Sequence, residues 1–263
     1  MDLGMKGRVA VVAAASKGLG LAAAIALANE GAKIAICSRS TEQISLAAER
    51  IRLQTGAEVL AESVDVREES QVKAFFAKTY ERWKRIDICV TNSGGPPSKL
   101  FSETQTEDWR AAVDQLLMST VFFAREALPR MKEQKWGRLV AITSYTVKQP
   151  VDGMLLSNSI RAGVTGLVRT LANEYAAYGI TVNNVCPGYT ATDRIGELAK
   201  MMAERRGIAG EEIIAEWEKQ IPAGRLGTPE EFAAVVAFLA SEQAGYINGA
   251  SISVDGGIVR SLI

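Results

Sequence analysis

Short apolar segments alternate with longer helical segments along the whole chain of 263 residues. The first apolar segment, residues 8–14 (RVAVVAA), is rich in valine and is typical of a buried β-strand. Further strands are predicted at residues 33–38, 58–64, 86–91, 138–143, 181–185 and 251–254. Helices are predicted at residues 18–30, about 68–83, 107–134 and 153–178, and in two pieces between 193 and 219. Because apolar strands alternating with helices form a parallel sheet covered on both faces, we predict an α/β fold.

Local signals at several helix ends support this assignment. Gly31 follows the first helix, where a left-handed glycine commonly ends a helix. The segment from Ser40 to Gln43 has the pattern of a capping box and opens a second helix. The segment from Thr228 to Glu231, with proline at the first helical position, predicts the start of the last helix. No linker or repeat interrupts the pattern, so we predict one domain over residues 1–263.

Composition narrows the possible functions. The 30 basic and 30 acidic residues cancel, so we expect neither nucleic acid nor a membrane surface as a partner. The chain has no histidine, which excludes histidine-based catalytic triads and the common histidine metal sites. Its three cysteines, Cys37, Cys89 and Cys186, are far apart and are expected to be buried thiols, so no metal site is predicted. No signal-peptide pattern or membrane span is recognisable, and we expect a cytoplasmic protein.

The loops that follow the strands are the place to look for a ligand, because ligands of such sheets bind outside the carboxyl ends of the strands. The loop after the first strand is small and glycine-rich, and it leads into a helix whose N-terminus would attract a pyrophosphate. Its candidate cofactor-binding residues are Ala14, Ser16, Lys17, Gly18, Leu19 and Gly20. This loop resembles the glycine fingerprint of the short-chain dehydrogenase/reductase family, except that Ala14 stands where the first glycine should be.

The end of the second strand bears on the choice of cofactor. It reads Ser38-Arg39, with no acidic residue to accept hydrogen bonds from a ribose 2′-hydroxyl. Arg39, together with Lys17, suits a 2′-phosphate, so the resemblance implies NADP(H) in preference to NAD(H). The alternative is that both are solvated surface cations.

Motifs at later strand ends extend the resemblance over about residues 6–258. They match the family's aspartate that contacts adenine, its Asn-Asn-Ala-Gly segment and the proline-glycine segment that holds the nicotinamide carboxamide. The matching residues are Asp65, Val66, Asn92, Ser93, Gly94, Pro187, Gly188, Thr190 and Thr192. Residues 225–231 and 248–257 resemble the family's C-terminal signatures. The resemblance implies a single Rossmann-type, doubly wound parallel sheet of about seven strands, and it is strongest for the 3-oxoacyl-acyl-carrier-protein reductase type.

The catalytic positions depart from the family pattern. Ser144 matches the family's serine. Ser157 stands where the proton-donating tyrosine is expected, and Arg161 replaces the lysine four residues later. Leu116 stands at the asparagine position. The pair Tyr80 and Lys84 has the right spacing, but it lies in the helix before the fourth strand, which is the wrong place.

Other groups could take over the lost chemistry. Arg161 keeps a positive charge that could hold ribose hydroxyls, although an arginine cannot relay protons. A serine hydroxyl is far less acidic than a phenol, so Tyr145, Tyr189 and Lys148 are candidate substitutes for the missing donor. The alternative is that these three side chains only line the pocket. The candidate catalytic residues are therefore Ser144, Ser157, Arg161 and Tyr145.

Two functions stay open. The first is NADP(H)-dependent reduction of a small or acyl-linked carbonyl substrate, or the reverse oxidation. The second is nucleotide binding without redox turnover, as a sensor or assembly partner. The resemblance also implies a homodimer or homotetramer packed through the helices at 107–134 and 153–178. Residues 193–220, which include Met201, Met202 and Trp217, are expected to form a helical segment covering the substrate; its methionines fit a deformable lid or simply core.

Overall fold

The computed structural model describes residues 2–262, and its strands form one parallel sheet of seven strands in the order β3-β2-β1-β4-β5-β6-β7. The order reverses between β1 and β4, which creates the crevice where ligands of such sheets bind. The predicted doubly wound fold is therefore confirmed, with strand ends within a few residues of those expected. The strands are β1 (Val9–Val12), β2 (Lys33–Ser38), β3 (Val59–Ser63), β4 (Ile88–Thr91), β5 (Gly137–Ile142), β6 (Ile180–Pro187) and β7 (Ser251–Val254).

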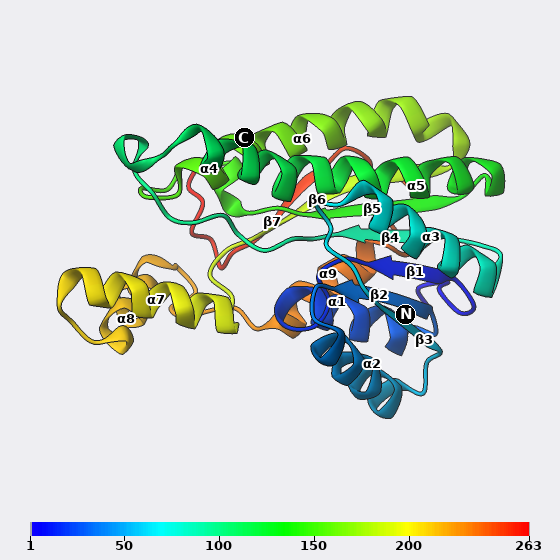
Figure 1. Ribbon diagram of the computed structural model, residues 1–263, viewed down its shortest axis with the longest axis horizontal. Helices are drawn as coiled ribbons and strands as arrows, with labels where there is room; N and C mark the ends of the chain where they lie inside the picture. Colours follow the sequence, from blue (N-terminus) through cyan, green and yellow to red (C-terminus); the bar gives the residue numbers. More distant parts are fainter. Residues whose placement is uncertain (1, 263) are drawn as a thin grey trace.

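Helices cover both faces of this sheet (Figure 1). On one face lie α1 (Gly18–Asn29), α2 (Thr41–Thr55) and α9 (Pro229–Leu239). On the other lie α3 (Glu69–Trp83), α5 (Ser119–Gln134) and α6 (Leu155–Tyr175). The pair α7 (Asp193–Arg206) and α8 (Gly210–Gln220) stands apart from both layers at one end of the molecule, in yellow in Figure 1.

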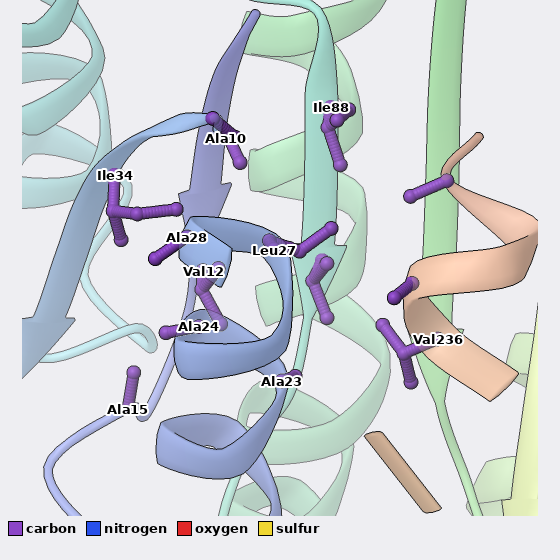
Figure 2. Packing of buried hydrophobic residues seen from close by; sticks show 14 of the residues in the cluster. Ala10, Val12, Ala15, Ala23, Ala24, Leu27, Ala28, Ile34, Ile88 and Val236 are labelled. Atoms are coloured by element: carbon purple, nitrogen blue, oxygen red, sulfur yellow. The ribbon is translucent and has the colours of Figure 1, made fainter. Parts of the chain in front are cut away.

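Alternation along the strands separates two apolar cores. In β1, Ala10 and Val12 pack with Leu27 of α1 and Val236 of α9, as Figure 2 shows. Val11 of the same strand belongs to the opposite core, with the side chains of α3, α5 and α6. Because both faces of each central strand are buried, the strands are mostly apolar, and this explains why they stand out in the sequence. Cys37, Cys89 and Cys186 are buried free thiols, as expected.

The helix predicted at residues 107–134 is interrupted. It consists of α4 (Thr106–Ala112), a π-helical turn η2 (Val113–Met118) and α5. In the wide turn the amide of Ser119 bonds to the carbonyl of Asp114, and the hydroxyl groups of Ser119 and Thr120 bond back to the carbonyls of Gln115 and Leu116 at 2.6 and 3.0 Å. Side-chain hydroxyls thus satisfy carbonyls that a π-turn leaves without regular helical partners.

Other helix ends differ from the sequence prediction by small, local effects. The helix predicted at 153–178 begins at Leu155, after Gly153 in a left-handed conformation (φ 73°), and ends in the 3₁₀ turn η4 (Ala176–Tyr178). Of the two caps predicted, that at Ser40 accepts from the amide of Gln43 without a reciprocal bond, whereas that at Thr228 forms the reciprocal box with Glu231. Two further 3₁₀ turns are η1 (Phe101–Glu103) and η3 (Tyr145–Val147).

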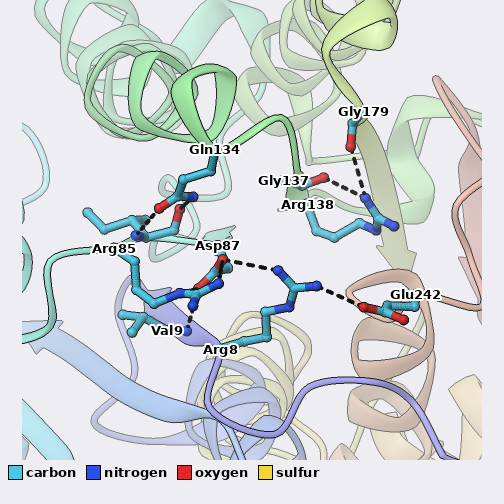
Figure 3. A network of polar contacts seen from close by, with 10 residues as sticks. Arg8, Val9, Arg85, Asp87, Gln134, Gly137, Arg138, Gly179 and Glu242 are labelled. Carbon is cyan, nitrogen blue, oxygen red and sulfur yellow. Dashed lines mark hydrogen bonds and ion pairs between the residues drawn. The ribbon is translucent and has the colours of Figure 1, made fainter.

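The amino ends of β1 and β4 are joined by a buried carboxylate (Figure 3). Asp87 is fully buried and accepts a hydrogen bond from the amide of Val9 at 2.9 Å. Arg85 binds both carboxylate oxygens at 2.7 and 2.8 Å, and Arg8 approaches one of them at 3.4 Å. This network fixes the sheet at the edge opposite the strand ends where a ligand is expected.

Among residues 2–262, no helix combines the length and the apolar character needed to cross a bilayer.

Candidate functional site

A cavity of about 810 Å³ lies at the carboxyl ends of the strands. Its walls come from the loops after β1 to β6, together with residues of η2, α6 and α7. Every site residue expected from the sequence lines this cavity except Gly20. Residues from seven separate segments therefore meet in one place, because parallel strands present their carboxyl ends at one edge of a sheet.

Gly20 has a structural position instead, because it packs against the backbone of the β1–α1 loop. A Cβ atom at this position would collide with the carbonyl oxygen of Ala14. That oxygen also receives a hydrogen bond from the side chain of Asn92 at 3.4 Å. Gly20 therefore allows the first turn of α1 to close onto the β1–α1 loop.

The β1–α1 loop has the geometry of a phosphate cradle. Ala14 and Gly18 are both left-handed, with φ of 48° and 58°. Lys17 is the N-cap of α1, no side chain caps the helix, and its first turn contains no acidic residue. The amide groups of this turn and the positive end of the helix dipole are therefore available to an anion in the cavity.

The two cations expected at a 2′-phosphate have different surroundings. Arg39 is exposed, and within residues 2–262 its guanidinium has no ion-pair partner. Lys17 instead lies 3.4 Å from Asp193 and 3.6 Å from Glu197, both on α7. Arg39 is thus the unpaired charge, whereas Lys17 connects the cofactor loop to the α7 segment.

Asp65 is engaged by a neighbour that the sequence reasoning did not consider. Arg67 binds its carboxylate through Nε and Nη2 at 2.6 to 3.1 Å. These hydrogen bonds are the main reason why the pKa of Asp65 lies below its usual value. Asp65 is therefore ionised, and Arg67 fixes its orientation in the cavity wall.

Two serines of the cavity wall, Ser144 and Ser157, have hydroxyl groups close to Thr146. Ser144 follows β5, and its Oγ accepts from the amide of Thr146 at 3.2 Å. The hydroxyls of Thr146 and Ser157 are 3.5 Å apart, and Ser157 is only 3% exposed. Ser157 thus lines the cavity, but its hydroxyl lies next to another hydroxyl.

Arg161 is a buried cation without a carboxylate. It is 8% exposed, and its Nη1 donates to the carbonyl oxygen of Ile142 at 3.3 Å. Within residues 2–262 no carboxylate pairs with it, and burial lowers the pKa of its guanidinium to about 10. Burying an unpaired charge is costly. The remaining donors of this side chain are therefore free for a ligand in the cavity.

Two tyrosines occupy the wall above Ser144. The rings of Tyr145 and Tyr189 are 5.7 Å apart, and the two phenols influence each other's pKa. Tyr189 also stacks on Trp217 of α8 at 4.6 Å. Burial raises the pKa of both phenols, so both groups stay protonated at neutral pH.

Lys148 and Leu116 do not line the cavity. Leu116 is buried in the π-turn, and the side chain of its neighbour Gln115 enters the cavity instead, where it donates to the carbonyl oxygen of Gly94 at 2.8 Å. Of the three substitutes considered for the missing proton donor, only Tyr145 and Tyr189 lie in the site.

The α7–α8 pair borders the cavity at its open side. Met202 lines the cavity, while Trp217 is buried in a small core between α7 and α8, with Met201 packed against it. Arg194 of α7 also enters the cavity, where its Nη2 donates to the carbonyl oxygen of Pro96 at 3.3 Å. Sequence reasoning missed Arg194, because the helix pattern alone does not indicate which of its many cations points inward.

Comparisons with known proteins were consistent with this geometry. A family model described as Enoyl-(Acyl carrier protein) reductase matches residues 13–259. The 3-oxoacyl-[acyl-carrier-protein] reductase FabG of Aquifex aeolicus (strain VF5) is 33% identical over 98% of this chain and 100% of that protein. The NADPH-dependent reductase BacG of Bacillus subtilis (strain 168) is 30% identical over 98% of this chain and 100% of that protein. The crystal structure of L-sorbose reductase from Gluconobacter frateurii, complexed with NADPH and L-sorbose, superimposes with a TM-score of 0.95, at 31% identity and full coverage of both chains.

Proposed function

Because the chain belongs to the short-chain dehydrogenase/reductase family, we propose that it is an NADP(H)-dependent reductase of a carbonyl substrate of the 3-oxoacyl type, with an altered catalytic centre. The observation that carries this proposal is the buried guanidinium of Arg161, which faces the cavity without a carboxylate partner. If no ligand bound here, the buried charge of Arg161 would destabilise the folded protein without any compensating interaction.

The cofactor preference rests on Arg39. Its unpaired guanidinium at the end of β2 suits a 2′-phosphate, and the adjoining Ser38 and Ser40 bring no negative charge. The uncapped N-terminus of α1 suits the pyrophosphate. BacG is described as NADPH-dependent, and the L-sorbose reductase structure contains NADPH, which supports the same cofactor here.

The residues at the other end of the cavity suit carbonyl reduction. When bound, the nicotinamide of the reduced cofactor supplies a hydride to the carbonyl carbon. The electron pair of the C=O bond then moves to the oxygen, where Arg161 stabilises the negative charge and the hydroxyl of Ser144 donates a hydrogen bond. A proton must then reach this oxygen to give the alcohol.

We assign proton delivery to the tyrosine pair. Tyr189 and Tyr145 are the phenols in the cavity, and burial keeps both protonated. Tyr189 is the more exposed of the two, so it donates its proton to the oxygen, and the neighbouring phenol of Tyr145 stabilises the resulting phenolate by donating a hydrogen bond to it. Ser157, held beside Thr146, shapes the pocket and leaves room for Arg161.

A second function, nucleotide binding without turnover, is favoured by the replacement of tyrosine by Ser157 and by the methyl group of Ala14 in the phosphate loop. The substitution of Ser157 by tyrosine together with Arg161→Lys separates the two functions. A large gain in reductase activity would indicate that the parent protein binds the cofactor without using it. Lower activity than the parent would favour the altered catalytic centre proposed here.

The first experiment is a calorimetric titration of the purified protein with NADPH and with NADH. We expect micromolar binding of NADPH and much weaker binding of NADH. The variant Arg39→Ala should lose the preference for NADPH while its NADH affinity stays unchanged. Failure of both cofactors to bind would contradict an oxidoreductase function.

We also propose a homodimer or homotetramer that packs through α5 and α6. Several small residues of α6, namely Ala162, Gly163 and Gly166, are exposed on one side of the helix, which would allow a second copy to approach closely. Analytical ultracentrifugation tests this proposal, and a monomer at micromolar concentration would contradict it.

A further inference from the structure

A second cation accompanies Arg161 in the substrate half of the cavity. Arg194, at the second position of α7, extends across the opening to the loop after β4, where Nη2 donates to the carbonyl oxygen of Pro96 at 3.3 Å. A Cβ atom at Gly95 would lie 3.4 Å from the same nitrogen. The side chain of Arg194 therefore lies directly against a backbone wall and points into the site.

Arg194 is poorly neutralised. Its single carboxylate contact within residues 2–262 is with Glu197, at 3.9 Å, and Glu197 is shared with Lys17 at 3.6 Å. Both side chains of the Arg194–Glu197 contact are about half exposed, at 49% and 59%, so the contact contributes little. The cavity lining as a whole carries more basic than acidic side chains, although the whole chain has 30 of each.

Both guanidinium groups line the same cavity, where their positive charges repel each other. Next to burial, which has the largest effect, the charge of Arg194 contributes to lowering the pKa of Arg161. No described carboxylate pairs with Arg161. An anion bound between the two side chains would remove this repulsion and would satisfy donors that have no partner in the protein.

We propose that Arg194 and Arg161 form a carboxylate-binding site and that the preferred substrate is a small 3-oxo acid with a free carboxylate, an inference that rests on the proposed reductase function. In a 3-oxo acid, one methylene group separates the ketone from the carboxylate, so one guanidinium can donate to both oxygens. Arg161 then binds the ketone oxygen and one carboxylate oxygen, and Arg194 binds the other. A thioester or ester carries no charge for Arg194 to neutralise.

The surrounding side chains fit such a substrate. Ser144, Tyr145 and Tyr189, which carry hydroxyl groups, line the same cavity. Gly94 and Gly95 also line the cavity, and because they lack side chains Arg194 can lie against the backbone at Gly95.

The test compares acetoacetate with methyl acetoacetate, which differ in the carboxylate charge. We expect kcat/KM with NADPH to be about tenfold higher for the acid. The variant Arg194→Gln should abolish this preference by raising KM for the acid about tenfold while leaving the ester unchanged. Arg194→Lys should restore part of the preference. The matched control is Lys200→Gln, which removes a positive charge from an exposed position of α7 outside the cavity.

The outcomes separate this inference from the proposed function. Equal use of acid and ester, or a preference that survives in Arg194→Gln, would overturn the carboxylate site while leaving the reductase intact. If neither compound is turned over, calorimetry with the protein saturated with NADP⁺ decides: acetoacetate binding that is lost in Arg194→Gln supports the site, and its absence in the parent protein refutes it. Failure of NADPH itself to bind would instead refute the proposed function.

Discussion

The guanidinium group of Arg161 donates from Nη1 to the carbonyl oxygen of Ile142, 3.3 Å away at the carboxyl end of β5. A neutral carbonyl offsets only part of the cost of burying a full charge. The side chain is held where a ligand can complete its hydrogen bonds. The same arrangement lowers the free energy of unfolding of the ligand-free protein.

We therefore expect Arg161→Met to be more stable than the parent protein but inactive. Burial lowers the pKa of Arg161 from its ordinary value to about 10. The cost of the buried charge is thus fully present below pH 10 and declines as the native state loses its proton above that pH. Replacement by an apolar side chain of similar length should raise the free energy of unfolding by about 1–3 kcal/mol at pH 7–9. Urea denaturation measures this.

The control for this change is Arg169→Met, an exposed position on the same helix, which should alter stability by less than about 0.5 kcal/mol. A loss of stability in Arg161→Met would mean that the arginine supports the fold of the free protein.

Removal of the Tyr189 hydroxyl tests proton delivery. Tyr189→Phe should lower kcat by about 10²- to 10⁴-fold without changing NADPH affinity, because the ring and its stacking on Trp217 are kept. Tyr145→Phe should have a smaller effect, since its phenol acts through Tyr189. Steady-state kinetics with cofactor binding by calorimetry measure both.

The pH dependence follows from the same phenols. Burial raises the pKa of Tyr189 above its usual value near 10, so the acid needed for reduction stays protonated across neutral pH. Reduction should therefore keep its rate up to about pH 10 and fall only above it. A decline of kcat between pH 7 and 8 that is missing in Tyr189→Phe would assign a different, lower pKa to the donor.

Much of the site could be predicted from the sequence because its residues follow strands. Ala14, Arg39, Asp65 and Asn92 each end an apolar segment, and the parallel sheet brings such ends together. The same reasoning missed what depends on side chains distant in sequence. The pairing of Lys17 with Asp193, and the inward direction of Arg194, arise from how α7 packs across the cavity.

The break in the helix at residues 107–134 was missed for a related reason. The apolar pattern of that segment continues through the π-turn, so the pattern alone gives no sign of it. Ser119 and Thr120, whose hydroxyls bond to carbonyls of the turn, were the available signal, but such residues are also common in unbroken helices.

The carboxylate of Asp87 should account for a large part of the stability of the sheet. Asp87→Ala would leave the amide of Val9 and the cations Arg8 and Arg85 without their shared partner, and we expect a loss of about 3–5 kcal/mol in the free energy of unfolding. The control Glu69→Ala breaks the exposed pair with Arg125 and should cost less than about 1 kcal/mol. Equal effects in urea denaturation would contradict a structural role for the buried network.

Ala14 is strained by its own methyl group. Its φ of 48° is left-handed, a conformation that costs a residue with a Cβ atom about 1–2 kcal/mol. Ala14→Gly removes this strain, and although glycine makes the unfolded chain more flexible, we expect a net gain of about 0.5–1 kcal/mol in the free energy of unfolding. Since Ala14 lines the cavity, the loss of its methyl group should also tighten NADPH binding.

The matched control is Ala15→Gly, one residue further along the same loop. Ala15 is fully buried and is not left-handed, so its replacement removes packing and adds chain entropy without relieving strain. It should destabilise the protein by about 1 kcal/mol. Thermal unfolding of both variants, with and without NADPH, shows whether glycine stabilises the loop only at the strained position or changes its stability in the same way at both positions. A destabilising Ala14→Gly would show that the loop is held in this conformation at no cost.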